Sequence, residues 1–421
     1  MKIILFGIGK YIDAVEDLLQ EEVEILCYVD NDMEKQMVRR KDKEVRLLQE
    51  CSGMHFDYIV ITAFYYQSIE KQLLENGYSG EQIIPFFQEN FPFEDYNAVF
   101  KPIQSFRYSM ECRLKLYMAQ MERRQKLFYE NFIYEMADRA RKEKIELPRI
   151  CSVEETCQKI IDEKVSVSRY GDGEFQIILG AAKDVYQDDD RELSRRLQEI
   201  LISNLDGHIV ALADDYGCME GLREENKNVI RGYMTSKKRR EHYQYIDMEK
   251  QYYNAYISRP YIIYPHEERE MAKNRFLQLK KIWDGRKVLI VEGEHTRTGV
   301  GNDLLDNVKS IERIIAPGKN AFSAYGEIRE AVLGQKSDRL VLAALGPAAT
   351  VLAYDLAGEG YQTIDIGHLD LEYEWYLKGE GYSQIHNKYN NEVPGGTIVE
   401  DIYDEDYDRS VIKRIVLETE G

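Results

Sequence analysis

Two carboxylates separated by one glycine are the residues of this chain best placed to do chemistry. Asp172 and Glu174 lie in the stretch VSVSRYGDGEFQIIL, residues 165–179. Its apolar pattern predicts a buried strand up to Tyr170 and a helix that starts at Glu174. If the chain is still extended at 172–174, both carboxylates point the same way. Such a pair of hard oxygen donors suits Mg²⁺ or Mn²⁺. The same D-G-E could instead be a solvated turn that caps the next helix.

Two arginines lie beside glycines that could leave room for a phosphate. Arg169 precedes the D-G-E, and Arg297 lies in EGEHTRTGVGND, residues 292–303. An arginine can clamp a diphosphate with two parallel hydrogen bonds, but either of these could equally form a structural ion pair. In GPAAT, Gly346 to Thr350, a bend comes just before a helix start, where backbone N–H groups can seat a phosphate.

A histidine among acids follows the last predicted strand of the large domain. His368 comes three residues after Asp365 and six before Glu374. In such a loop a histidine can act as a base, a metal ligand or a hydrogen-bond donor to phosphate. A second acidic pair, Asp214 and Asp215, ends an earlier strand, where its carboxylates could equally be solvated.

The strands expected from apolar runs must position these side chains. They cover residues 287–291, 311–316, 340–345 and 362–366, and each runs into a polar loop. In open α/β sheets, ligands bind outside the carboxyl ends of the strands. The unusual polar residues of the domain gather there, so the sequence predicts an active site at that edge.

The N-terminal 92 residues have the pattern of a small Rossmann-like domain. A strand at 2–6 runs into GIGKYI, a helix follows to Leu19, and a strand at 23–29 ends in Asp30. This is the opening of a dinucleotide-binding unit, although Ile12 stands where a third small residue is expected. The domain therefore binds a nucleotide or has kept the fold as a structural or docking module.

Composition limits the classes of function. The net charge of −19 argues against a general binder of nucleic acid or of anionic membranes. Six cysteines without a CxxC pair suit a reducing compartment. No stretch approaches the length of a membrane span, and the apolar start is too short for a signal peptide, so a cytoplasmic protein is expected. A helical connector is predicted over residues 103–145, with a dimer interface as one use for its apolar stripe.

Several long motifs together resemble one known family. They are RYGDGEF, VEGEHTRTGVGND, PGKNAF, LGPAATVLAYDL and DIGHLDLEYEW, and they run in order from about Pro148 to Gly381. The chain here is similar to the GT-D glycosyltransferases, a bacterial family with a Rossmann-like fold. The resemblance implies a nucleotide-diphosphate sugar donor, typically UDP-linked, and a divalent ion such as Mn²⁺. It places the metal-binding D-x-E motif of the family on Asp172 and Glu174.

The expected protein is thus an α/β chain with four parts. These are a Rossmann-like N-terminal domain (1–92), the helical connector (103–145), a larger Rossmann-like GT-D domain (146–385) and a C-terminal extension (386–421). The N-terminal domain resembles those attached to bacterial sugar-processing enzymes. We expect a metal-dependent glycosyltransferase that acts on a saccharide, lipid-linked or glycoprotein acceptor, as a monomer or a homo-oligomer.

The expected site residues fall into three groups. Asp172 and Glu174 would hold Mn²⁺ or Mg²⁺, and Asp365, His368 and Glu374 are the catalytic candidates. The candidates for binding the nucleotide sugar are Arg169, Thr296, Arg297, Gly299, Asn302, Asn320, Gly346 and Thr350. Two alternatives remain open: an NAD-dependent sugar oxidoreductase or epimerase that uses Gly7, Gly9 and Asp30, or a non-catalytic sensor of nucleotide sugars in polysaccharide assembly.

Overall fold

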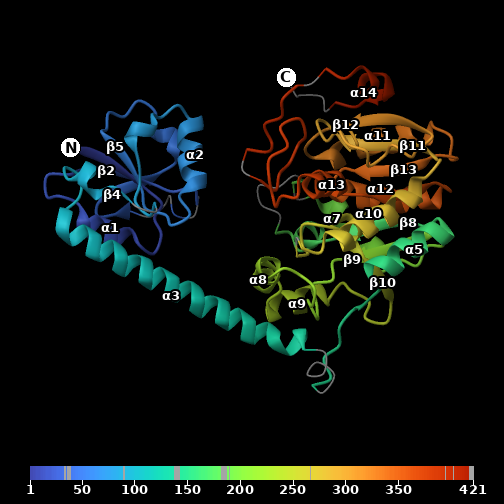
Figure 1. Cartoon of the computed structure of the whole chain (residues 1–421), viewed down its shortest axis with the longest axis horizontal. Coiled ribbons are helices and arrows are strands. Elements are labelled where there is room, and N and C mark those ends of the chain that lie inside the picture. The colour runs from blue at the N-terminus through green and yellow to red at the C-terminus, as the bar shows by residue number, and fades with distance from the viewer. Residues whose placement is uncertain are drawn as a thin grey trace. The chain divides into compact units, whose positions relative to one another are not determined.

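A computed structural model describes the chain from residue 1 to 416, with short gaps. The gaps are residues 33–34, 36–38, 89–90, 137–142, 182–186, 189, 266, 394 and 402. The chain divides into two compact units, Met1–Gln125 and Lys126–Gly421, and each is built around its own sheet (Figure 1). The expected α/β class with two Rossmann-like parts is confirmed.

The first unit has a six-stranded sheet in the order β3-β4-β2-β1-β5-β6. All its strand pairs are parallel except the β3–β4 hairpin. Apolar side chains of β1 alternate between two cores, with Ile3 and Leu5 on one face and Ile4 and Phe6 on the other. The elements are β1 (Lys2–Phe6), α1 (Ile12–Leu18), β2 (Glu24–Val29), β3 (Arg39–Arg40), β4 (Lys43–Arg46), β5 (Tyr58–Ile61), α2 (Gln67–Glu75) and β6 (Ile83–Pro85).

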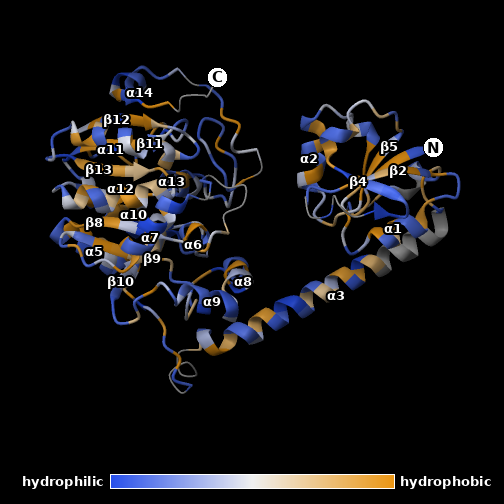
Figure 2. Cartoon of the chain, turned by 180° about the vertical axis from the view of Figure 1, so that it is seen from behind, coloured by the Kyte–Doolittle hydropathy of each residue, from blue (hydrophilic) through white to orange (hydrophobic). Residues whose placement is uncertain are grey.

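One long helix, α3 (Pro102–Glu135), forms most of the predicted connector and contributes to both units. Cys112 is buried in the core of the first unit, whereas Glu135 forms an ion pair with Arg231 of the second. Between them α3 carries exposed apolar side chains such as Leu114 and Met121. Figure 2 shows hydrophobic and hydrophilic residues alternating along this helix. Residues 137–142 of the predicted connector lie outside the described residues. The expected homo-oligomer stays a prediction.

The second unit is built on a nine-stranded sheet in the order β15-β12-β11-β13-β14-β8-β9-β10-β7, and every pair in it is parallel. Its central strands are buried on both faces, as parallel sheets require. The strands are β7 (Arg149–Ile150), β8 (Ser166–Tyr170), β9 (His208–Leu212), β10 (Gln251–Asn254), β11 (Lys287–Gly293), β12 (Ser310–Ala316), β13 (Leu340–Ala344), β14 (Gln362–Asp365) and β15 (Val411–Arg414).

Helices cover both faces of this sheet and follow most of its strands (Figure 1). Pro347 opens α12 directly after the bend at Gly346, as the sequence predicted. The helices are α5 (Val153–Glu163), α6 (Asp172–Ile178), α7 (Arg191–Leu201), α8 (Glu224–Tyr233), α9 (Ser236–His242), α10 (Arg269–Trp283), α11 (Tyr325–Leu333), α12 (Pro347–Gly358), α13 (Leu369–Lys378) and α14 (Glu405–Ser410).

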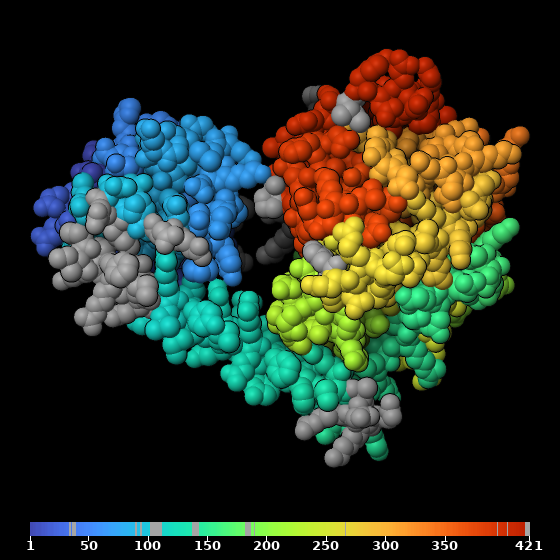
Figure 3. Space-filling view, in the orientation of Figure 1, coloured from blue at the N-terminus to red at the C-terminus, as the bar shows by residue number. Residues whose placement is uncertain are grey.

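The C-terminal segment, residues 386–416, folds back onto the second unit. Its strand β15 pairs with β12 at the edge of the large sheet. Figure 3 shows the segment in red against the orange and yellow surface of the unit. The sequence predicts a C-terminal extension over residues 386–421, and in the structure residues 411–414 of it form this edge strand. The backbone groups of β12 at the sheet edge supply the hydrogen-bonding partners for that strand.

Candidate active site

The parallel strands of the second unit bring the predicted site residues to one edge of its sheet. The strands β8, β9, β11, β13 and β14 all end at this edge, because paired parallel strands run in the same direction. The strand β14 lies between β13 and β8, so the loops after β14 and β8 are neighbours. The expectation that residues from 169 to 374 meet at one edge therefore follows from the topology of the sheet.

The D-G-E stretch is not extended; of the two conformations that the sequence left open, the structure has the one in which an acid caps the next helix. The helix α6 begins at Asp172, and Gly171 is its N-cap. Glu174 is the third residue of the helix, and its Oε2 accepts a hydrogen bond of 2.8 Å from the backbone N–H of Gly171. This cap satisfies an N–H group that would otherwise lack a partner at the helix start, and it turns Glu174 inward while Asp172 stays exposed.

Burial gives Glu174 an unusual protonation equilibrium. Desolvation of its carboxyl group outweighs the hydrogen bond from Gly171 and raises its pKa to about 7, and the nearby charge of Asp365 adds to the rise. Burial also raises the pKa of Asp214 and of Asp215 to about 6. Asp215 accepts a hydrogen bond from the hydroxyl of Tyr256, and the charge of Asp172 adds to its shift. Carboxylates at the ends of β8, β9 and β14 therefore influence one another.

These carboxylates suit a hard divalent cation better than a soft one. Asp172 and Glu174 offer oxygen donors, as Mg²⁺ and Mn²⁺ prefer. Among the described residues, no group of three or more His, Cys, Asp or Glu side chains is arranged to hold a metal ion on its own. A cation bound here would thus take further ligands from water or substrate, which is the usual situation for Mg²⁺ beside phosphates.

Arg169 and Asp365 form an ion pair across β8 and β14. Nη2 of Arg169 lies 2.8 Å from Oδ1 of Asp365, and Nε donates to the carbonyl of the same residue. Thr350 donates to the other carboxylate oxygen at 3.2 Å. Gly367, at φ +46°, leaves room for the guanidinium, because a Cβ there would lie 2.1 Å from Nη2 of Arg169. Of the two roles considered for Arg169, this geometry favours a structural ion pair over a free diphosphate clamp. Asp365 orients the guanidinium of Arg169.

His368 lies at the start of α13 and belongs to a second network. Its Nδ1 is 2.7 Å from Oε1 of Glu392, a residue of the C-terminal segment. Arg259 lies between two acids, with its Nη1 2.7 Å from Glu392 Oε2 and 3.5 Å from Glu372 Oε1. Burial alone would raise the pKa of Glu392, but Arg259 and His368 outweigh it and hold that pKa well below its usual range. His368 remains partly exposed at the sheet edge.

Glu374 belongs to a third, buried network. It lies 3.1 Å from Nζ of Lys388, which also contacts Asp370 at 2.6 Å. Asn302 donates to both acids, at 2.7 and 2.9 Å, and the N–H of Gly299 donates to Asp370. Glu374, Gly299 and Asn302 are therefore brought together as expected of one site. Their contacts tie the loop after β11 and the C-terminal segment to α13.

We expect Lys388→Met to destabilise the second unit by about 3–5 kcal/mol, because it would leave Asp370 and Glu374 as uncompensated buried charges. The side chain of Lys388 is fully buried, at 0 % exposure. Urea denaturation followed by circular dichroism measures the effect. The matched control is Lys378→Met, since Lys378 is an exposed residue of α13. A similar, small change in both variants would contradict this prediction.

Arg297 is buried and does not face open solvent. Its Nη1 donates to the carbonyls of Asn387 and Glu400, both at 2.8 Å. Its backbone is left-handed, at φ +51°. Arg297 therefore holds the C-terminal segment against the loop after β11, and the expected diphosphate clamp at this residue is not formed in this arrangement. Thr296 lies next to it, half-buried.

The remaining predicted binding residues lie on two loops, whose preceding strands flank β11 in the sheet. Asn320 has a left-handed backbone, and its side chain forms two hydrogen bonds with Asp188. Gly346, at φ +57°, precedes the buried first turn of α12. Both follow strands of the sheet, at β12 and β13. The structure places them at the predicted edge, and their contacts with a donor stay predictions.

The partners of these residues were missed in the sequence. Lys388 lies 14 residues from Glu374, and Glu392 and Arg259 lie 24 and 109 residues from His368; no motif spacing connects them. The relevant signal was local composition: a lysine and an acid close together after Gly381, in a segment with several polar residues.

In the first unit, the loop after β1 is closed by Asp30. Its carboxylate accepts hydrogen bonds from the N–H groups of Ile8, at 2.6 Å, and Asp32, at 2.9 Å. Lys35 lies 3.1 Å from the same carboxylate. In a dinucleotide site this acid would hold a ribose and the loop would face phosphate. Here the carboxylate of Asp30 accepts a hydrogen bond from the loop after β1, so no observation favours the NAD-dependent alternative.

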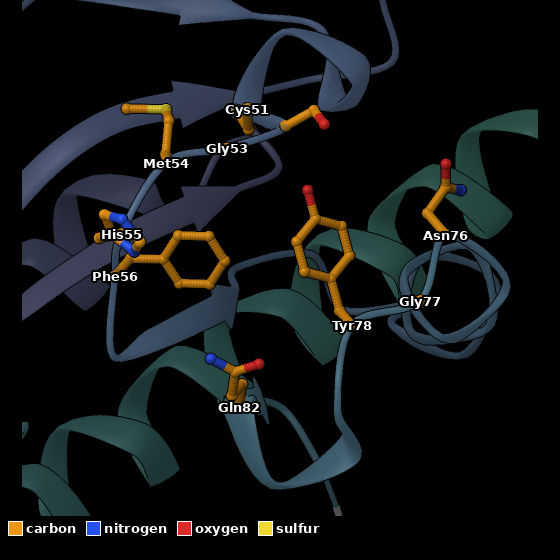
Figure 4. Close-up of a pocket in the computed structure, with 10 residues that line it drawn as sticks. Cys51, Gly53, Met54, His55, Phe56, Asn76, Gly77, Tyr78 and Gln82 are labelled. Carbon is orange, nitrogen blue, oxygen red and sulfur yellow. The ribbon is translucent and has the colours of Figure 1, made fainter.

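A surface pocket of about 320 Å³ lies elsewhere in the first unit. Figure 4 shows the rings of Phe56 and Tyr78 facing one another in it, with Asn76 and Gln82 nearby. Its lining segments precede β5 and β6, so it lies at the amino ends of these strands. Nucleotides bind at the opposite edge of Rossmann-like sheets.

The fold and the site together define a Rossmann-like α/β unit with acids, arginines and a histidine at the carboxyl edge of a parallel sheet. Residues 167–393, more than half of the chain, match the family described as Glycosyltransferase GT-D fold. The chain belongs to this glycosyltransferase family, which confirms the resemblance seen in the sequence. Residues 1–84 match a separate family, described as C2185-like, N-terminal.

Relatives and solved structures agree with this assignment. A probable glycosyl transferase of Streptococcus gordonii is 35% identical over 275 residues, which cover 64% of this chain and 39% of that protein. Glycosyltransferase GlyD of Streptococcus pneumoniae is 34% identical over 278 residues, 65% of this chain and 33% of that protein. The matches thus span between a third and two-fifths of the length of these relatives.

A solved Streptococcus sanguinis structure, titled a new glycosyltransferase, is 36% identical with a TM-score of 0.60, and the match covers 64% of this chain and all of that one. A second structure, titled as having a distinct glycosyltransferase fold, is 34% identical with the same TM-score, and the match covers 64% of this chain and 96% of that one. No described helix is both long and apolar enough to cross a membrane.

Proposed function

We propose that the second unit is a metal-dependent glycosyltransferase. It moves a sugar from a nucleotide-diphosphate donor, UDP-linked, to a saccharide, lipid-linked or protein acceptor in the cytoplasm. The observation that carries the proposal is the pair Asp172 and Glu174 at the carboxyl end of β8, in a chain of the GT-D family. Six free cysteines suit the cytoplasmic part of the proposal.

Asp172 and Glu174 are the residues that would hold Mn²⁺ or Mg²⁺. When bound, such an ion stabilises the negative charge that develops on the departing nucleotide diphosphate. The ion pair of Arg169 with Asp365 keeps a positive guanidinium at the same edge of the sheet. We propose that the loops ending in Asn320 and Gly346 contact the nucleotide, because both follow strands at that edge.

We propose His368 as the base that removes a proton from the acceptor hydroxyl. Its Nδ1 is engaged by Glu392, which leaves Nε2 as the atom that takes the proton. Asp365 and Glu374 are the weaker candidates, since their carboxylates already accept hydrogen bonds from Arg169 and Asn302 respectively. We assign these two acids to positioning the site.

A panel of nucleotide sugars with Mn²⁺ tests the proposed function without a known acceptor, because slow transfer to water releases the nucleotide. Release from one donor that stops when the metal is chelated would support the transferase and identify its sugar. Binding of a nucleotide sugar without any release would instead favour a sensor. If the chain binds no nucleotide sugar, the proposal is wrong.

Stabilisation by Mn²⁺ should grow with pH between about 5.5 and 8. Glu174 must lose its proton to bind the ion, and its pKa is raised to about 7. Without metal, the stability of the folded chain should change with pH in the opposite direction. The raised pKa of Glu174 favours the folded state at low pH, and this contribution to stability is lost as the pH rises toward 7. Thermal melts with and without Mn²⁺ measure both trends.

The matched variant is Glu174→Gln, whose amide oxygen can still accept the hydrogen bond from Gly171. We expect the pH dependence of the Mn²⁺ effect to disappear in this variant. A Mn²⁺-induced shift in Tm that stays constant across this pH range in the unmodified chain would contradict the role of Glu174.

A further inference from the structure

We propose that Glu392, on the C-terminal segment, positions His368 for its part in the transfer reaction. The inference rests on the proposed function, in which His368 is the base. It adds a residue from a different segment of the chain: Glu392 fixes which ring nitrogen of His368 carries a proton and which faces the substrate.

The contact between the two residues is close. Nδ1 of His368 lies 2.7 Å from Oε1 of Glu392, a distance typical of a charge-assisted hydrogen bond. A carboxylate acts only as an acceptor and a guanidinium only as a donor; Glu392 is nearer to Nδ1 than Nη2 of Arg259 is, at 2.7 Å against 3.3 Å, so we assign the hydrogen to Nδ1 and the free lone pair to Nε2. This is the tautomer that a base using Nε2 requires.

The carboxylate of Glu392 is itself held in place by Arg259. Arg259 donates to both of its carboxylate oxygens and contacts Glu372 at 3.5 Å. Glu372 is fixed by the backbone N–H groups of Tyr261 and Ile262, at 3.1 and 2.8 Å. A chain of charged groups therefore runs from a buried turn after β10 to the imidazole. In this chain the positive charge of Arg259 lies between the negative charges of Glu372 and Glu392.

The loop that carries Glu392 is also locked. Asn390 is fully buried, its amide donates to the carbonyl of Ser383, and its Oδ1 accepts from the N–H of Glu392. Its own N–H donates to the carbonyl of Gly396, where a Cβ would lie 2.3 Å from the carbonyl of Asn390. Such a loop presents Glu392 at a fixed position, as the orientation of a catalytic base requires.

Among the described residues, the charged and titratable groups of this network come from four places in the chain. They are Glu392 on the C-terminal segment, Arg259 after β10, Glu372 on α13, and the hydroxyl of Tyr382, which interacts with the other three. Glu392 offers an acceptor to Nδ1 of His368, whereas Arg259, 3.3 Å from the same nitrogen, offers only donors. Removing the charge of Glu392 alone leaves the guanidinium of Arg259 beside the ring.

The test is Glu392→Gln, read out by activity and by nuclear magnetic resonance of histidines labelled with ¹⁵N. We expect kcat for donor hydrolysis to fall roughly 10–100-fold, with the donor KM within about twofold, since supporting hydrogen bonds to active-site histidines have effects of this size or larger. Glu392→Asp, which keeps the charge, should recover part of the rate.

The resonance experiment separates positioning from a structural role. The signal of His368, identified by its loss in His368→Gln, should report hydrogen on Nδ1 in the unmodified chain and a larger share of the tautomer with hydrogen on Nε2 in Glu392→Gln. The matched control is Glu400→Gln, because Glu400 lies 3.8 Å from Nδ1 of His386 in an exposed pair on the same segment. It should leave rate and His368 signal unchanged.

Two results would overturn the proposal in different ways. If Glu392→Gln leaves the tautomer of His368 unchanged while the unmodified chain turns over a donor, Glu392 is only structural. If the unmodified chain turns over no nucleotide sugar, the proposed function fails and the inference fails with it.

Discussion

Neutralising the D-G-E pair, as Asp172→Asn with Glu174→Gln, is expected to lower metal-dependent release of nucleotide by about 10³-fold, or roughly 4 kcal/mol of transition-state stabilisation. Both side chains keep their shape, and the amide of the new residue 174 can still accept the hydrogen bond from Gly171 that caps α6. The fold should therefore persist while the charge that attracts the cation is lost. Steady-state release of nucleotide from the donor measures the effect.

A matched control for this substitution exists on another helix. Glu155 is also the third residue of its helix, and its carboxylate accepts a hydrogen bond of 2.8 Å from the backbone N–H of the N-cap, Ser152. Glu155→Gln makes the same change at an equivalent capping position, and we expect it to keep full activity. Equal losses in the two variants would mean that helix capping, and not metal binding, explains the effect.

The fold was predictable from the sequence because its signals are local. Buried parallel strands appear as short apolar runs, and β1, β12 and β13 lie within a residue or two of the predicted ranges. The polar loops also follow these strands directly in the sequence. Once parallel pairing is known, their meeting at one edge follows from geometry. The apolar runs therefore predict the α/β fold and the edge that carries the site, whereas the glycosyltransferase family was predicted from the long motifs.

The details of the site depend on contacts between distant segments, which spacing does not encode. The chain is not extended at Asp172, because the carboxylate of Glu174 caps a helix by accepting a hydrogen bond from the N–H of Gly171, three residues earlier. Arg297 has the residue type of a phosphate clamp, yet carbonyl groups some 90 and 103 residues further on bind it. The sequence predicted the carboxyl edge of the large sheet as the site and many of the residues that lie there. It did not predict which of these residues form hydrogen bonds or ion pairs with one another.

Substituting His368 by asparagine should lower kcat for donor hydrolysis by about 10²–10⁴-fold, the range typical of a lost general base. The affinity for the donor should hardly change, since the imidazole acts on the incoming hydroxyl or water and not on the diphosphate. Rate measurements at saturating donor, together with equilibrium binding of the same donor, separate the two quantities.

The control for this variant is His386→Asn, because His386 is exposed on the C-terminal segment and pairs only loosely with Glu400, at 3.8 Å. It should retain the full rate. Added imidazole should restore part of the rate to His368→Ala, where the cavity left by the ring can admit a free base, but not to the Asp172→Asn/Glu174→Gln variant. If donor affinity falls as steeply as the rate in His368→Asn, the residue binds the donor and the base must be sought among Asp214 and Asp215, whose pKa values are raised to about 6.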